Sequence, residues 1–133
     1  MKKIVLLLIL IISLSACASS SRVTSENQPQ KNTQDYFDVI ADRLSFHLST
    51  YISQNKSDLI KDAIFYEMPY PRIYAILVFQ PDGKFIDGFI KDNGKIKQLI
   101  YTVYFRDPTG MSIKVRKIFF NKKEIGVIKI FYR

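Results

Sequence analysis

Between residues 35 and 52 the apolar positions recur at steps of three and four, the spacing of one buried helix face. The stripe consists of Phe37, Ile40, Leu44, Leu48, Tyr51 and Ile52. It predicts a long amphipathic helix from Asp35, with Asn32 or Thr33 as its N-terminal cap. The acidic side chain of Asp35 also suits the positive end of the helix dipole.

A polar stretch then breaks the stripe, and a second helical pattern follows it. Ser57 can cap this shorter helix, which runs to Ala63 or Phe65. Pro69 and Pro71 end it, because a proline disfavours helical geometry in the residue before it.

After Pro71 the pattern changes to short runs rich in β-branched and aromatic residues, which predict strands. The predicted strands are residues 73–79, 84–90, 99–106, 111–120 and 125–132. Turn-forming residues separate them, at 80–83, 92–94, 107–110 and 121–124. In the first turn, Pro81 presets the backbone, Asp82 tolerates the turn geometry and Gly83 can take a positive φ. The turns are short, so sequential strands are expected to be antiparallel neighbours.

The order of elements predicts an α+β domain with a long and a shorter helix packed on one face of a five-stranded antiparallel sheet. The last two strands carry apolar residues on both faces, for example Ile118 and Phe119. One face requires the long helix as cover. The other is expected to meet a pocket or a partner.

The N-terminus has the layout of a secretory signal peptide. Lys2 and Lys3 precede an uncharged apolar run at residues 4–14, which is short for a membrane-spanning helix. The tetrapeptide Leu14-Ser15-Ala16-Cys17 follows. An ordinary signal peptide with an incidental cysteine is the alternative interpretation.

This tetrapeptide resembles the lipobox of bacterial lipoproteins. The resemblance implies cleavage between Ala16 and Cys17, a diacylglycerol on the Cys17 thiol and an acyl group such as palmitate on the new amino group. Cys17 is the only cysteine of the chain, and lipidation gives it a use in an exported protein. The residue after the lipidated cysteine is Ala18. An aspartate at this position would resemble the inner-membrane retention signal of many lipoproteins, and it is absent here. If the envelope has two membranes, the protein is therefore expected in the outer membrane, facing the periplasm.

The predicted organisation is therefore a signal peptide at 1–16, a lipidated Cys17 with a flexible tether at 17–33, and one domain at 34–133. The tether is Ser-, Asn- and Gln-rich with no apolar period, although an extra strand folded onto the domain is an alternative. The formal charge of +8 becomes +8 − 2 = +6 without Lys2 and Lys3. A basic surface favours anionic lipids, anionic polysaccharide or an acidic protein, or simply solubility. Export argues against nucleic acid.

Two stretches carry a further resemblance: Arg72 to Ile86 (RIYAILVFQPDGKFI) and Lys117 to Ile130 (KIFFNKKEIGVIKI). Behind a long helix they resemble the opening and closing hairpins of extracytoplasmic PAS-like sensor modules, the Cache or PDC domains. The resemblance spans residues 35–133 and implies a sensor-like binding module. In ligand-binding members a longer segment after the second strand lies over the pocket, whereas residues 91–98 are short here. The chain also ends at a strand with no membrane exit, so signalling would need a membrane-bound partner.

No catalytic constellation is recognisable in the sequence, and no enzyme activity is expected. His47 is expected to be a partly buried helix residue. Asp82, Asp87 and Asp92 are spread along a hairpin and do not have the clustering of a metal site. No cofactor is expected beyond the lipid on Cys17.

The candidate ligand-binding residues are Arg72, Tyr74, Tyr104 and Arg106. An arginine can hold a carboxylate through two hydrogen bonds, and tyrosines can line a small pocket. The alternative is surface arginines beside core tyrosines. The expected function is a lipid-anchored, non-catalytic binding module for a small molecule or partner protein; a structural or assembly lipoprotein of the cell envelope is the alternative.

Overall fold

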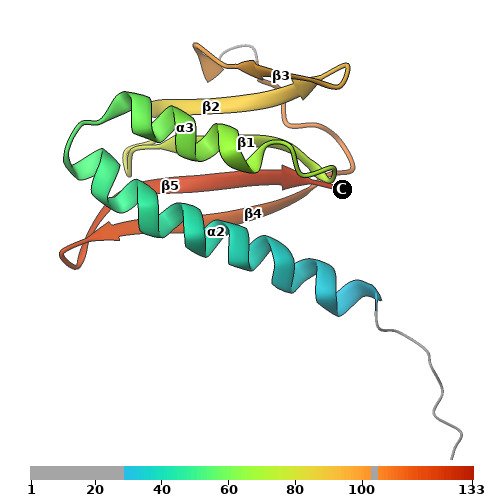
Figure 1. Ribbon diagram of the computed structural model, residues 1–133, viewed down its shortest axis with the longest axis horizontal. Helices are drawn as coiled ribbons and strands as arrows, with labels where there is room; N and C mark the ends of the chain where they lie inside the picture. The colour runs from blue at the N-terminus through green and yellow to red at the C-terminus, as the bar shows by residue number, and fades with distance from the viewer. Residues whose placement is uncertain (1–28, 103–104) are drawn as a thin grey trace, which may run out of the picture.

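The computed structural model describes residues 29–102 and 105–133. Two helices, α2 (Pro29–Ser53) and α3 (Ser57–Glu67), cover one face of a five-stranded antiparallel sheet (Figure 1). The strands are β1 (Ile73–Phe79), β2 (Phe85–Asp92), β3 (Lys95–Gln98), β4 (Ser112–Phe120) and β5 (Lys123–Tyr132). The predicted α+β class is confirmed.

The apolar stripe of α2 forms the helix side of the core, as its spacing predicted. Phe37, Ile40, Leu44 and Leu48 are at most 1 % exposed. The helix begins at Pro29, earlier than expected, and a proline is tolerated there because the first helical N–H groups have no partner within the helix. The capping role predicted for Ser57 is wrong: Lys56 occupies the cap position of α3 without a side-chain hydrogen bond.

The sheet order is β3-β2-β1-β5-β4, which corrects the prediction for the third strand. Residues 95–98, taken as part of a loop, form β3 and pair with β2. The predicted strand at 99–106 is wrong: its described residues belong to the connection between β3 and β4, and no strand is assigned there. β3 and β4 lie at opposite edges of the sheet and are not neighbours, so this connection crosses the whole sheet.

The connection crosses on the face away from the helices. There Leu99, Phe105 and Met111 pack against a second apolar cluster centred on Ala75, Leu77 and Phe131. The rings of Phe105 and Phe131 meet edge to face with their centroids 4.9 Å apart. The sheet is therefore covered by helices on one side and partly by this connection on the other.

The hairpin between β1 and β2 confirms the predicted turn. Gly83 has a φ of +89° and its N–H donates to the carbonyl of Gln80 at 2.9 Å, the bond that closes a β-turn. The N–H of Lys84 donates to the Asp82 carboxylate at 2.9 Å. This turn joins β1 and β2, and a bulge between Val78 and Phe79 sets their register beyond it.

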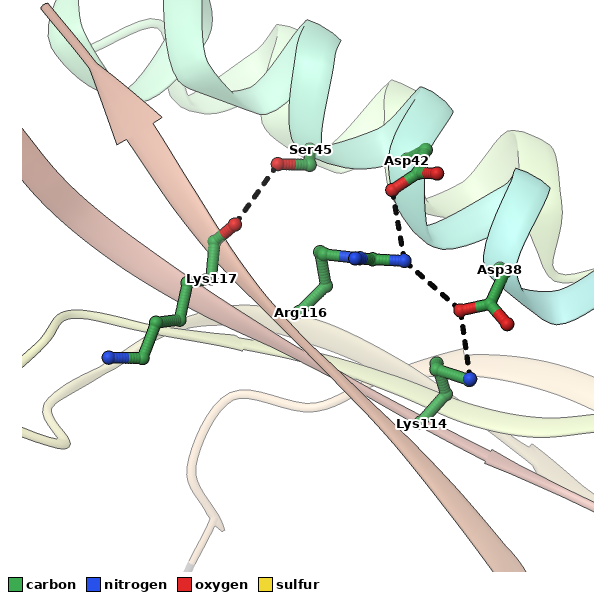
Figure 2. A network of polar contacts seen from close by, with 6 residues as sticks. All are labelled: Asp38, Asp42, Ser45, Lys114, Arg116 and Lys117. Carbon is green, nitrogen blue, oxygen red and sulfur yellow. Dashed lines mark hydrogen bonds and ion pairs between the residues drawn. The ribbon is translucent and has the colours of Figure 1, made fainter. Parts of the chain in front are cut away.

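Ion pairs fix α2 over the edge strand β4 (Figure 2). Asp38 contacts Lys114 at 2.8 Å and Arg116 at 3.0 Å, and Asp42 also contacts Arg116 at 3.0 Å. Ser45 on the same helix donates to the carbonyl of Lys117 at 3.2 Å. The cationic residues on this face of β4 therefore serve the fold.

Candidate functional site

A cleft of about 520 Å³ lies at the end of the sheet where β1 begins and β5 ends. It is lined by Pro71, Arg72, Ile73, Tyr74, Lys91, Met111 and Arg133. Its size falls within the range of small-molecule sites. Three of its seven lining residues have cationic side chains and none has an acidic one.

Arg72 reaches the cleft from the turn that leads out of α3 into β1. The turn is held by hydrogen bonds from the N–H of Ile73 to the carbonyl of Tyr70 and from the N–H of Arg133 to the carbonyl of Arg72, both 3.1 Å. The Arg72 Nε also donates to the carbonyl oxygen of Arg133. The guanidinium is therefore positioned by the junction of β1 and β5.

Lys91 approaches from the end of β2. Its Nζ donates to the carbonyl oxygen of Tyr70, and an ammonium carries three N–H donors in all. Burial lowers the pKa of Lys91 below its ordinary value of 10.5, because a charged ammonium is poorly solvated there. A bound anion would relieve this cost and raise the pKa again.

Tyr74 and Met111 give the cleft an apolar part beside its cations. Both pack against the cluster on the face away from the helices. Tyr74 is half-buried, so its ring can contact the body of a ligand. Together with Arg72 and Lys91, these residues suit a molecule that carries one anionic group and a small apolar portion.

A network between the helices supports the same turn. Glu67 lies at the end of α3 and is only 2 % exposed. Its two carboxylate oxygens accept hydrogen bonds from Nε and Nη2 of Arg43, each at 2.7 Å. This pairing raises the pKa of the Arg43 guanidinium. Burial and a hydrogen bond with Tyr70 raise the pKa of Tyr36 to about 12. Glu67 and Tyr70 thus tie the residues just before Arg72 to α2.

The structure brings together two of the four predicted ligand residues, Arg72 and Tyr74. Arg106 is exposed on the connection between β3 and β4 and is not among the residues that line the cleft. Tyr104 lies outside the described residues, as do Ala16 and Cys17.

Sequence reasoning missed Lys91 and Arg133. The register of the first hairpin places Ala75 opposite Ile90. Tyr74 and Lys91 are the next residues of the two strands, and both line the cleft. The turn at residues 80–83 alone did not indicate Lys91, because a bulge between Val78 and Phe79 shifts the pairing by one residue. Arg133 follows β5, and its position beside Arg72 depends on β1 and β5 being neighbours, which no local pattern indicates.

The other singled-out residues lie in separate places. His47 is exposed, which corrects the expected partial burial, and its ring lies 5.6 Å from that of Phe46. Asp82 accepts from the turn, Asp87 accepts from Gln98 at 3.0 Å, and Asp92 pairs with Lys97. Within residues 29–102 and 105–133, no group of three or more His, Cys, Asp or Glu residues is placed to hold a metal ion.

A second cleft, of about 530 Å³, lies at the opposite end of the sheet. Its apolar part is formed by Ile52, Ile60, Ile86 and Ile125. Its rim mixes charges, with Asp82 and Glu124 against Lys123. The second cleft therefore has both acidic and basic side chains at its rim, whereas the charged side chains of the first cleft are all cationic.

The fold and the site define an α+β domain with a basic cleft at one end of its sheet. Comparison with protein-family models, with curated proteins and with solved structures finds no match. In the described part of the chain, neither helix is long and apolar enough to cross a membrane.

Proposed function

We propose that the protein is a lipid-anchored lipoprotein of the bacterial cell envelope whose domain is a non-catalytic binding module for an anionic ligand. The anchor is Cys17 and the fold is a PAS-like sensor scaffold. The observation that supports binding is the convergence of Arg72, Lys91 and Arg133 on one cleft. Each of these side chains comes from a different segment, so the fold itself assembles the site.

The cleft supports binding of a carboxylate or phosphate. Arginine presents two parallel N–H donors to such a group, and lysine adds a point charge. Tyr74 and Met111 contact the remainder of the molecule. Any signal would pass to a separate membrane-bound partner.

A thermal melting screen of the mature chain, residues 17–133, tests this function. Acetate, succinate, citrate and inorganic phosphate are the first ligands to screen. A ligand at about 100 times its Kd stabilises the folded state by about 2.7 kcal/mol, which raises the Tm by roughly 10 °C or more. The shift should disappear in Arg72→Met and Lys91→Met and persist in Arg106→Met, the matched control outside the cleft. Absence of a shift with every anion would overturn the proposal.

A structural or assembly lipoprotein is the second candidate. The observation that favours it is the outward face of β4, where Ile113, Val115 and Phe119 are 46 %, 54 % and 53 % exposed. β4 is an edge strand, and such a face suits docking on a larger complex. Crosslinking in the native membrane should then capture a protein through these three positions. Recovery of the uncrosslinked chain alone would count against this function.

A further inference from the structure

The basic cleft lies at the end of the domain where α2 begins. The ring of Phe37, near the start of α2, stacks on Tyr132 with centroids 3.8 Å apart. The ring of Tyr36 meets Tyr70 edge to face at 5.3 Å. Tyr132 directly precedes Arg133, and the carbonyl of Tyr70 holds Lys91. Figure 1 shows the start of α2 and the end marked C toward the same end of the strands, on the right of the view.

This end is also the one nearest to the predicted anchor along the chain. Cys17 precedes Pro29 by 29 − 17 = 12 residues. Twelve residues span at most about 40 Å, whatever their conformation. From Pro29 to Phe37 the helix adds about 12 Å. The anchor therefore holds the basic cleft within about 50 Å of the lipid surface, close enough for direct contact.

The charge of this end suits an anionic surface. Arg72, Lys91 and Arg133 line the cleft there, and Lys95 begins the neighbouring strand β3. Asp92, beside Lys91, is paired with Lys97. The opposite end carries both signs, with Lys56, Lys84, Lys122 and Lys123 interspersed with Asp58, Asp82 and Glu124. Tyr74 and Met111 also suit the interfacial zone, where an apolar body meets polar headgroups.

We propose that the domain docks on its own membrane through this end, with the phosphate of an anionic phospholipid headgroup held between Arg72, Lys91 and Arg133. This inference rests on the proposed function and names the anion that the cleft takes. The lipid anchor supplies proximity and the cleft supplies orientation. The second cleft, at the opposite end of the sheet, then points away from the bilayer.

Vesicle sedimentation of the mature chain carrying Cys17→Ser tests the docking, because no acyl chain then contributes. The vesicles are phosphatidylcholine alone or with roughly one third phosphatidylglycerol, at low ionic strength. We expect binding to the anionic vesicles only. Arg72→Met and Lys91→Met should each lower the partition coefficient about fivefold. The charge-matched controls Lys84→Met and Lys122→Met, at the opposite end, should change it less than twofold.

The outcomes separate the two levels of the proposal. Equal losses for both pairs of variants would indicate general charge attraction and overturn the docking site. Binding of inorganic phosphate in the melting screen, without vesicle binding, would overturn the docking and leave the proposed function standing. Binding to neither would overturn both. Arg72→Met and Lys91→Met are accepted only if they melt cooperatively, and the charge reversal Lys91→Glu provides a further variant that should abolish sedimentation.

Discussion

Replacing Arg43 with methionine should destabilise the domain through the carboxylate that it leaves behind. Glu67 is 2 % exposed, and both of its oxygens accept from Arg43 at 2.7 Å. Breaking a buried ion pair from one side costs about 3–5 kcal/mol, because the remaining charge is uncompensated. The Arg43 side chain is itself 39 % exposed, so water can reach its place. We therefore expect a loss of about 2–3 kcal/mol.

Urea unfolding measures this loss. With a slope of about 2 kcal/mol per molar urea, the midpoint should fall by about 1 M or slightly more. The double variant Arg43→Met/Glu67→Gln removes the charge as well and should recover at least half of the loss. Arg106→Met, an exposed arginine, should stay within about 0.5 kcal/mol of the parent.

The comparison of Arg43→Met with the double variant isolates the charge that Glu67 keeps, because the two proteins differ only at that carboxylate. A loss below 0.5 kcal/mol, or the same loss in the double variant, would refute the role of the buried charge.

Three further predictions concern the sheet, the helix contact and the anchor. Gly88→Ala should cost about 1–3 kcal/mol, because its Cβ would lie 2.7 Å from the Leu77 side chain and 2.8 Å from a backbone oxygen; an unchanged urea midpoint would contradict this packing. Tyr36, with its pKa raised to about 12, should contribute a small stability that is present below pH 10 and lost as the pH rises through 12. A difference titration against Tyr36→Phe by tyrosinate absorbance tests it, and ionisation near pH 10 would contradict the partial desolvation and the bond to Tyr70. Cys17→Ser should abolish metabolic labelling with palmitate and leave the precursor unprocessed; unchanged labelling would eliminate the lipoprotein assignment.

Local patterns predicted the elements that contribute to the main core. Phe37, Ile40, Leu44 and Leu48 recur at helical spacing because one face of α2 is buried along its length. β1 was predicted with its observed bounds because it is apolar throughout and buried on both faces. The class of the fold follows from these two facts.

β3 escaped prediction because it is short and polar. Its sequence is Lys-Ile-Lys-Gln, and Ile96 is its single apolar residue, as suits an edge strand. The apolar run after it includes Leu99, Ile100 and Tyr101, which resemble a strand in composition. They belong to a connection that crosses the sheet, and that crossing depends on contacts far apart in the sequence, such as Phe105 with Phe131.

Two residues of the site, Arg72 and Tyr74, could be predicted from the sequence because they belong to a locally patterned segment. Arg72 precedes a strongly patterned strand and Tyr74 lies within it. The place of Lys91 depends also on the bulge between Val78 and Phe79, which the turn does not indicate. Arg133 becomes a neighbour of Arg72 only through the pairing of β5 with β1, which connects positions 61 residues apart. A site assembled from three segments becomes visible only when the strand order is known.

The charge of Lys91 is expected to lower the stability of the fold and to support anion binding. Its lowered pKa means that folding disfavours its charge, so the ammonium costs stability at any pH where Lys91 is charged in the folded protein. The carbonyl of Tyr70 also accepts from the N–H of Ile73 at 3.1 Å, and so keeps a partner when Lys91 is replaced. Lys91→Met should therefore be at least as stable as the parent in urea, yet lose anion binding.

A residue kept only for the fold would show the reverse behaviour, with stability falling and binding following it. Lys91→Met separates these cases because one protein sample gives both the urea midpoint and the ligand-induced shift in Tm. A clear fall in the midpoint would show that Lys91 serves the α3–β1 turn. An unchanged or higher midpoint with no ligand response would show that this charge is retained for binding, at a cost to the fold.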